Sequence, residues 1–367
     1  MKFERLGNLT SIQTGKIDVN KAVVGGKYPF FTCSRDVYEI NDAPFEGKAV
    51  LVAGNGDLNV KYYEGKFNAY QRTYFLFVNN ENELIPRYLY WFLESYVGRL
   101  RTESIGSTIK YIKMGNLTEA EIPLPSLETQ REIVEKVDNA LSEIDLLETN
   151  LELSVEKTDN LIQSLQEEVF TDIENKWKPS KLGDLGKWIT GSTPSTSNRD
   201  FWGDEVPFVT PADLSASGEL GEIGRRISKL GSEQVRIVDA PSVLLVCIGA
   251  TLGKVAWTNS TITTNQQINT LVVDAKKTNP KFVMYLLSSP KMQKKLWDSS
   301  TGTTVPILNK GNLENIDISI PLPEKQSEIV EKLDRAFYEV DSLKAQIEIK
   351  RNHTNALRQS LLSDAFN

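Results

Sequence analysis

The chain contains almost no histidine and almost no cysteine. Its 367 residues include one histidine, His353, and two cysteines, Cys33 and Cys247. A single histidine excludes His-based zinc sites, His-bearing catalytic triads and most general-base schemes. Two cysteines so far apart in sequence form neither a disulfide framework nor a Cys-rich metal motif, so we expect both thiols to be buried. Chemistry within this chain would have to rely on carboxylates, lysines or tyrosines.

Long apolar runs are also missing. No window holds 18 consecutive apolar residues, and the first residues, "MKFERLG", lack the apolar stretch of a secretory signal. The composition, 40% hydrophobic and 25% charged, is typical of a globular protein with room for two or three domains. We therefore expect a cytoplasmic protein without a membrane segment.

The acidic charge is concentrated in one part of the chain. The net charge of -7 divides into +1 for residues 1–125, -10 for 126–176, +3 for 177–320 and -1 for 321–367. Phosphate contacts depend on lysine and arginine, so a net acidic chain at first argues against nucleic acid as a partner. Because residues 1–125 and 177–320 are slightly basic, they could still present local positive faces to a nucleic acid.

One long stretch of the sequence is written twice. Residues Gln130–Thr171 align with Gln326–Asn367 at a constant offset of 196 residues without a gap, and 18 of the 42 pairs are identical. The likeness extends upstream to "GNL" at Gly115 and Gly311. Such a repeat predicts two copies of one structural unit.

The earlier part of each half matches more weakly but in the same order. "AVLVAGNG" from Ala49 and "SVLLVCIG" from Ser242 read as apolar strands that end in a glycine turn. "PRYLYWFL" from Pro86 and "PKFVMYLL" from Pro280 place proline at the start of an apolar helix. Each half is therefore predicted to be a mixed domain of short strands and one or two helices, closed by a long helix.

Apolar residues in the repeated stretch recur at alternating steps of three and four, which is typical of a coiled coil. We expect this helix to begin with a capping box at Thr129 and Glu132. Each copy spans about 40 residues, or about 60 Å. The predicted seam is Ile133, Val137, Ile144, Leu147, Leu151, Leu161 and Leu165 in the first copy, and Ile329, Leu333, Val340, Leu343, Ile347, Leu357 and Leu361 in the second.

These patterns predict an α+β fold with two similar mixed α/β domains separated by a pair of long coiled-coil helices. The chain path favours an antiparallel pair and approximate internal two-fold symmetry. The predicted boundaries are 1–122 and 177–320 for the domains, and 123–176 and 321–367 for the helices. A rigid spacer of this kind suits a long, roughly two-fold symmetric ligand such as duplex DNA, whose half-sites lie about 34 Å apart or a multiple of it.

The motifs resemble a known family. "PLPSLETQREIVEKVD" and "PLPEKQSEIVEKLD", each preceded by an S-x-G-[ST]-T loop from Ser104 or Ser300, resemble the repeated regions of type I restriction-modification specificity subunits. "FWGDEVPFVTPADL", "GATLGKV" and "TNQQI" in the second half are similar to the target recognition domains of that family. The resemblance covers essentially the whole chain.

The resemblance implies a non-catalytic protein that binds double-stranded DNA at a bipartite site. Each target recognition domain would read one half-site, and the helices would set the gap and dock two adenine N6-methyltransferase subunits. Restriction subunits with translocase and endonuclease activity would join that complex. S-adenosylmethionine, Mg²⁺ and ATP would be used by these partners, and the chain itself would carry no metal, cofactor or catalytic residue. "NAYQRTYFLFV" in the first half departs from "TTNQQINTLVV" in the second, so we expect the two half-sites to differ.

Polar residues on turns between strands are the candidates for DNA contact, because lysine and arginine hold phosphates while arginine, asparagine and glutamine pair with base edges. Each is equally consistent with a solvated side chain or a structural hydrogen bond. The candidates are Asn55, Lys61, Gln71, Arg72 and Lys110 in the first half, and Thr193, Arg199, Thr251, Lys254, Gln266, Gln267 and Thr304 in the second.

Two simpler interpretations stay open. "GATLGKV" from Gly249 has three residues between its glycines and Val255 after its lysine, so a strand-turn-strand is favoured over a phosphate-binding loop. The leucine seam would also fit a stand-alone DNA-binding or scaffold protein that uses its helices only for self-association, with a merely solvated acidic face. Neighbouring genes for a methyltransferase and a helicase-nuclease would separate the two functions.

Overall fold

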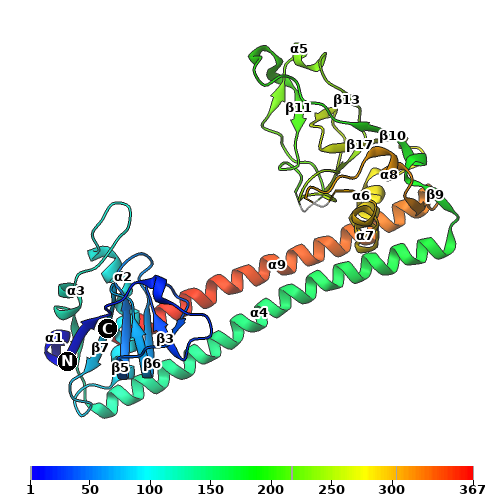
Figure 1. Cartoon of the computed structure of the whole chain (residues 1–367). Coiled ribbons are helices and arrows are strands. Elements are labelled where there is room, and N and C mark those ends of the chain that lie inside the picture. The colour runs from blue at the N-terminus through cyan, green and yellow to red at the C-terminus, as the bar shows by residue number, and fades with distance from the viewer. Residues whose placement is uncertain (1, 216–217, 303, 367) are drawn as a thin grey trace. The chain divides into compact units, whose positions relative to one another are not determined.

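A computed structural model of the chain describes residues 2–215, 218–302 and 304–366. The chain divides into two compact units, residues 1–152 with 347–367 and residues 153–346. Each unit holds one mixed α/β domain and a part of both long helices, α4 (Leu127–Lys176) and α9 (Pro323–Phe366) (Figure 1). The duplication seen in the sequence is therefore a duplication of folded units.

The first domain is built on a six-stranded sheet of order β2-β7-β5-β6-β3-β4. All neighbouring strands pair antiparallel except β3 and β6, which run parallel. Its elements are β1 (Phe3–Arg5), α1 (Leu6–Leu9), β2 (Thr10–Thr14), the 3-10 turn η1 (Val19–Lys21), β3 (Tyr28–Phe31), β4 (Tyr38–Ile40), β5 (Phe45–Ala53), β6 (Val60–Ala69), β7 (Thr73–Val78), α2 (Pro86–Glu103), α3 (Met114–Thr118) and β8 (Glu121–Pro123).

Strand β5 is buried on both faces because the sheet separates two cores. Val50 and Val52 join a core that includes residues of α2, which lies against the sheet (Figure 1). Ala49 and Leu51 point the other way, into an aromatic core that includes Phe67. Alternate residues of a strand face opposite sides, so a continuous apolar run is what a doubly covered strand requires.

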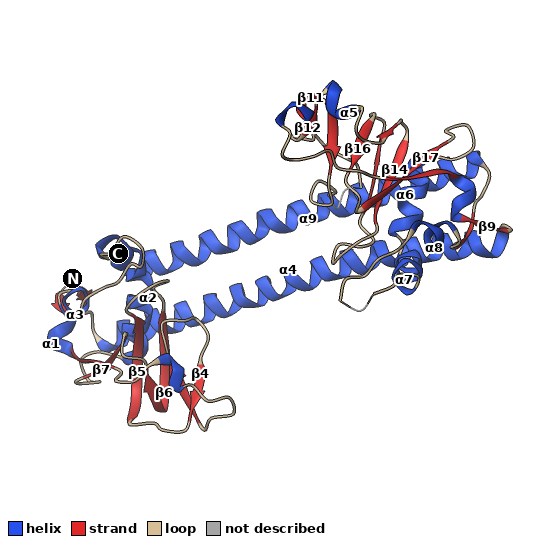
Figure 2. Cartoon of the chain, turned by 45° about the horizontal axis from the view of Figure 1, so that its top comes forward, coloured by secondary structure: helices blue, strands red, loops and turns tan. Residues whose placement is uncertain are grey.

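The second domain has two four-stranded sheets, of order β10-β17-β14-β15 and β12-β11-β16-β13 (Figure 2). Strands β11 and β16 run parallel, as β3 and β6 do in the first domain. Its elements are β9 (Pro179–Lys181), η2 (Leu182–Leu185), β10 (Gly186–Thr190), η3 (Arg199–Phe201), β11 (Trp202–Val209), β12 (Arg226–Ile227), α5 (Lys229–Ser232), β13 (Ile237–Val238), β14 (Ser242–Val246), β15 (Val255–Thr258), β16 (Ile262–Thr264), β17 (Ile268–Val273), α6 (Pro280–Ser288), α7 (Pro290–Asp298), α8 (Lys310–Glu314) and β18 (Asp317–Ser319).

The two domains follow one plan with one difference. Strand β14 also divides its side chains between two cores, with Val243 and Leu245 on one side and Leu244 and Val246 on the other. In the first domain the single strand β6 pairs with both β5 and β3. In the second domain two strands share these places: β15 pairs with β14, and β16 pairs with β11. A small antiparallel pair closes each domain, β1 with β8 and β9 with β18.

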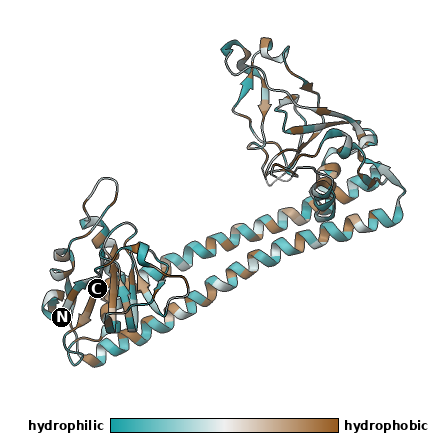
Figure 3. Cartoon of the chain, viewed as in Figure 1, coloured by the Kyte–Doolittle hydropathy of each residue, from teal (hydrophilic) through white to brown (hydrophobic). Residues whose placement is uncertain are grey.

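The long helices pair antiparallel within each unit. In the first unit, Val137 and Ile144 of α4 pack in a cluster with Leu361 near the end of α9. In the second unit, Val169 near the end of α4 shares a core with Leu333 near the start of α9. Ion pairs flank these contacts, including Arg358 with Glu148 (3.3 Å) in the first unit and Lys344 with Asp159 (2.5 Å) in the second. Hydrophilic and hydrophobic residues alternate along both helices (Figure 3).

The predicted seam was wrong at four leucines. Leu147 and Leu161 of α4 are 50% and 63% exposed, and Leu343 and Leu357 of α9 are 45% and 56% exposed. Of the remaining seam positions, Val137, Ile144, Ile329, Leu333 and Val340 are buried, and Ile133, Leu151, Leu165, Ile347 and Leu361 are half-buried.

The error has a physical cause. The inward stripe of α4 passes through Leu141 and Ile162, which are 4% and 8% exposed, and in α9 the half-buried residues next to Leu343 and Leu357 are the cations Lys344 and Arg358. Positions one residue apart fit the same period of three to four residues, so periodicity alone cannot show which of them faces the partner helix.

Two further expectations are corrected. The side chain of Ser126, not Thr129, caps α4: its Oγ accepts the Thr129 backbone N–H at 3.2 Å, three residues before the predicted start. Cys247 is buried as expected, but Cys33 is only half-buried. Burial raises the pKa of the Cys247 thiol to about 11.

Candidate nucleic-acid interface

Four connecting segments of the first domain meet at one place. The turn between β5 and β6 donates the Gly54 N–H to the Arg72 carbonyl at 2.8 Å and the Gly56 N–H to the Lys110 carbonyl at 2.9 Å. Glycine is required at both positions. A Cβ on residue 54 would lie 2.3 Å from the Arg72 carbonyl oxygen, and residue 56 has a φ of +71°. The candidates Asn55, Arg72 and Lys110 are thereby brought together.

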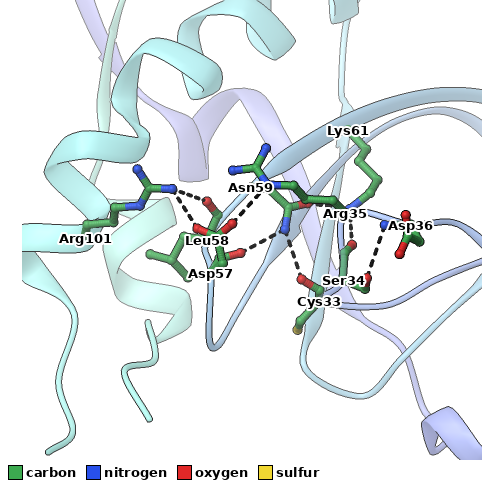
Figure 4. Close-up of polar contacts among 9 residues, drawn as sticks. All are labelled: Cys33, Ser34, Arg35, Asp36, Asp57, Leu58, Asn59, Lys61 and Arg101. Atoms are coloured by element: carbon green, nitrogen blue, oxygen red, sulfur yellow. Dashed lines mark hydrogen bonds and ion pairs between the residues drawn. The ribbon is translucent and has the colours of Figure 1, made fainter. Parts of the chain in front are cut away.

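Polar residues of this turn bond to the loop after β3 and to Arg101 of α2 (Figure 4). Asn59 Nδ2 donates to the carbonyl of Cys33 at 3.0 Å, which ties the turn to the loop after β3. Asp57 accepts from Arg35 Nε at 3.0 Å and from Arg101 Nη2 at 2.8 Å. Burial opposes ionisation of Asp57, but the two guanidinium groups outweigh it and lower the pKa of the carboxyl. These bonds hold the turn in a fixed conformation, with Arg35 and Arg101 beside it.

Lys61 is held among these polar residues. Its Nζ donates to the Ser34 carbonyl at 2.6 Å and also contacts Asn59 Oδ1. Burial lowers the pKa of Lys61. The structure therefore gives Lys61 an internal role in joining two loops, whereas Gln71 and Arg72 are exposed.

The second domain gathers the equivalent segments. Thr193 donates its hydroxyl to Gln266 Oε1 at 2.8 Å, and the Gln267 carbonyl accepts the Cys247 N–H at 2.7 Å. The Gly249 N–H bonds the Pro306 carbonyl at 3.0 Å, which brings in the hairpin that holds Thr304. This hairpin pairs Thr301 with Ile307, as Ile105 pairs with Tyr111 in the first domain, 196 residues earlier.

"GATLGKV" forms the predicted strand-turn-strand. It connects β14 and β15, which pair antiparallel, and its Gly249 and Gly253 have φ values of +92° and +93°. Thr251 and Lys254 lie on this turn, the lysine exposed and the threonine half-buried. The segment has no helix after its glycines, so it lacks the geometry of a phosphate-binding loop.

Arg199 lies apart from the gathered candidates. It starts the 3-10 turn η3, whose neighbour is α5, and its backbone carbonyl accepts the Trp202 N–H. Sequence reasoning missed three arginines that border the interface. Arg35 and Arg101 bind Asp57, and Arg236 donates to the Thr190 carbonyl at 2.8 Å. No motif marks these three, because each is placed by tertiary packing. The DNA contacts themselves stay predictions.

Within residues 2–215, 218–302 and 304–366, no group of three or more His, Cys, Asp or Glu side chains is placed to hold a metal ion. Over the same residues, no helix has the length and apolar character needed to span a bilayer.

The duplicated fold and its loops define a class of DNA-recognition proteins. Residues 1–157 and 174–351 match the family described as type I restriction modification DNA specificity domain. The chain therefore belongs to this family: it is a type I specificity subunit with two target recognition domains, the non-catalytic DNA-recognition part of such systems.

One relative supports this assignment over the full length of the chain, and a second over part of it. The type I restriction enzyme EcoDI specificity subunit of Escherichia coli is 28% identical over 401 residues, which covers 100% of this chain and 87% of that protein. The HindI specificity subunit of Haemophilus influenzae is 34% identical over 151 residues, 40% of this chain and 32% of that protein.

Two solved structures share the fold. One comes from a study of complex assembly and conformational transition of the type I R-M system. It has a TM-score of 0.77 at 21% identity, and the match covers 100% of this chain and 97% of that one. The other, the HsdS subunit from Thermoanaerobacter tengcongensis, has a TM-score of 0.60 at 20% identity, with coverage of 100% and 96%.

Proposed function

We propose that each target recognition domain reads one half of a bipartite DNA site through its gathered loops. The observation that carries this proposal is the repetition of the loop arrangement. In both domains backbone hydrogen bonds join the turn after β5 or β14 to the segment before β7 or β17, and to the bridge that pairs Ile105 with Tyr111 or Thr301 with Ile307. Rigid loops that present exposed Gln71 and Arg72, or Gln266 and Lys254, suit hydrogen bonding to base edges and phosphates.

The two half-sites should differ. At equivalent places the first domain has the exposed Gln71 and Arg72, and the second has the exposed Gln266 and the half-buried Gln267, whose Oε1 accepts from Asn265 Nδ2 at 2.9 Å. Arginine favours a bidentate contact with guanine and glutamine favours adenine. Different side chains on one scaffold therefore predict an asymmetric site.

The paired helices set the gap and dock two adenine N6-methyltransferase subunits in this proposal. The support is a set of exposed leucines on these helices. Leu147 and Leu343 are equivalent residues of the repeat, as are Leu161 and Leu357, and all four are exposed. Exposed leucines at the same positions of both copies indicate one kind of apolar partner surface used twice.

The charge of α4 adds a requirement on that partner. Residues 126–176 carry a net charge of -10, so the partner surface should be apolar with basic residues around it. S-adenosylmethionine, Mg²⁺ and ATP would be bound by the methyltransferase and restriction subunits. The protein would act in the cytoplasm, where its DNA lies.

The test is reconstitution with the cognate methyltransferase. The complex should methylate adenine at one bipartite sequence, found by single-molecule sequencing of treated genomic DNA, while the chain alone methylates none. Exchange of residues 1–122 for the corresponding domain of a relative should change one half-site and leave the other. A change in both half-sites, or methylation by the chain alone, would contradict the proposal.

A further inference from the structure

Each long helix is joined to its own domain by a fully buried glutamine. Gln130 is 0% exposed, and its Oε1 accepts the Ile85 N–H at 2.9 Å. Its Nε2 donates to the carbonyls of Glu83 at 2.9 Å and Pro125 at 3.1 Å. Because an amide offers two N–H donors and one carbonyl, this side chain is fully used in linking α4 to the segment that starts α2.

The second copy repeats these bonds. Gln326 is also 0% exposed, and its Oε1 accepts the Asn279 N–H at 2.8 Å. Its Nε2 donates to the carbonyls of Lys277 at 3.1 Å and Pro321 at 2.9 Å. Ile85 and Asn279 are the residues immediately before α2 and α6. The same link therefore joins α9 to α6.

An aspartate eight residues later makes a second link. Asp138 Oδ1 accepts from Arg87 Nη2 and from Trp91 Nε1, both at 2.8 Å. In the other unit Asp334 accepts from Lys281 Nζ at 2.9 Å and from the Tyr285 hydroxyl at 2.6 Å. The donors differ, but each pair is one cation and one aromatic residue four positions further along the helix.

Two links fix an orientation that one would leave free. The glutamine and aspartate are about 12 Å apart along the helix axis, at about 1.5 Å per residue. We propose that Gln130 with Asp138, and Gln326 with Asp334, are positioning residues that set the angle at which each recognition domain is mounted on its long helix. The inference rests on the proposed function, because that angle decides where the reading loops point.

Stability alone does not account for the aspartate link. The Arg87 and Asp138 side chains are 35% and 36% exposed, and those of Lys281 and Asp334 are 31% and 38% exposed. Ion pairs this accessible contribute little to the free energy of unfolding. Large apolar cores already hold α2 and α6 in place. What the hydrogen bonds add is direction, since they weaken steeply when misaligned.

The experiment compares two matched double variants of the full chain in complex with its methyltransferase subunits. Asp138→Asn with Trp91→Phe removes the charge and the indole donor in the first unit, and Asp334→Asn with Tyr285→Phe removes the charge and the hydroxyl in the second. The substrates are duplexes with both half-sites separated by the natural gap, or by a gap one base pair shorter or longer. The rate of adenine methylation is measured on each duplex.

We expect the preference for the natural gap to fall about tenfold in either variant, the change expected from losing one charge-assisted hydrogen bond, while the recognised bases stay the same. Arg87→Lys and Lys281→Arg, which give each unit the cation used by the other, should keep the preference. Melting temperatures of all variants are measured alongside.

A uniform fall in methylation on all three gaps, or an unchanged gap preference, would overturn the positioning role. Loss of the gap preference in Arg87→Lys and Lys281→Arg would also overturn it. Lysine and arginine each bind the aspartate in one of the two units, so either cation should be able to maintain the link. A different result would contradict the proposed function: an unsubstituted complex with no gap preference at all. That result would also contradict the positioning role, which depends on the proposed function.

Discussion

The Thr193 hydroxyl donates a 2.8 Å hydrogen bond to Oε1 of Gln266. Because an amide oxygen can accept two hydrogen bonds, this bond fixes the orientation of the Gln266 amide and leaves its Nε2 and one lone pair of its Oε1 available to a ligand. Both residues are exposed, and they come from segments 73 residues apart. Under the proposed function Gln266 reads a base, which requires a fixed donor and acceptor pattern, and the Thr193 hydroxyl would supply that fixation.

Thr193→Val should therefore relax recognition at one position of the second half-site. Loss of a correctly oriented amide costs about 1–3 kcal/mol of discrimination, or roughly tenfold or more in relative methylation rate. Methylated adenines are mapped by single-molecule sequencing. Ser197→Ala, which removes a hydroxyl bonded to that of Ser195, is the control and should leave both half-sites unchanged. An altered first half-site would contradict this assignment.

Leu147→Lys with Leu343→Lys should prevent binding of methyltransferase subunits without unfolding the chain. Both leucines are about half exposed, so a charge there does not disturb a core, but it would have to be desolvated in a helical interface. Co-purification with the tagged methyltransferase measures binding. Leu333→Ala, at a fully buried position, should instead lower the free energy of unfolding by about 2–5 kcal/mol. Full binding by the double lysine variant would argue against this docking surface.

Insertion of one heptad into both α4 and α9 should lengthen the recognised gap. Seven residues add about 10 Å of helix, which corresponds to roughly three base pairs of duplex DNA. The expected outcome is either two unchanged half-sites with a longer gap or loss of methylation. Full activity on the original gap would show that the helices do not act as a spacer.

Asp57 should make the stability of the first domain depend on pH in the acid range. Burial opposes its ionisation, but Arg35 and Arg101 lower its pKa below the ordinary value. A lowered folded-state pKa adds stability above the unfolded pKa of about 3.9, and this stability is lost as the pH falls through the folded pKa. Asp57→Asn should lower the melting temperature at pH 7 and have little effect near pH 2. An equal loss at both values would refute the charge explanation.

The sequence predicted the architecture better than the surfaces. Strands such as 242–246 and helix starts such as Pro86 and Pro280 were predictable because continuous apolar runs and proline at the first helical position are local signals. The offset of 196 residues held for the hairpins that pair Ile105 with Tyr111 and Thr301 with Ile307.

What failed depended on tertiary contacts. Leu147 was predicted inside the helix pair and is half exposed, because positions one residue apart fit the same periodicity. Arg35 and Arg101 had no local signal, since only the fold brings them to Asp57. Lys61 read as a surface cation, but its environment is set by Ser34, which is 27 residues away.

The packing of Phe366 means that the first domain is completed late in synthesis of the chain. Its ring lies 5.1 Å from that of Tyr88 and 5.8 Å from that of Phe92, inside the unit that contains the beginning of the chain. On the ribosome, the first domain emerges long before the segment that completes its cover. A nascent chain must therefore leave part of α2 unshielded until translation reaches the end of α9, and chaperones have that interval in which to bind it.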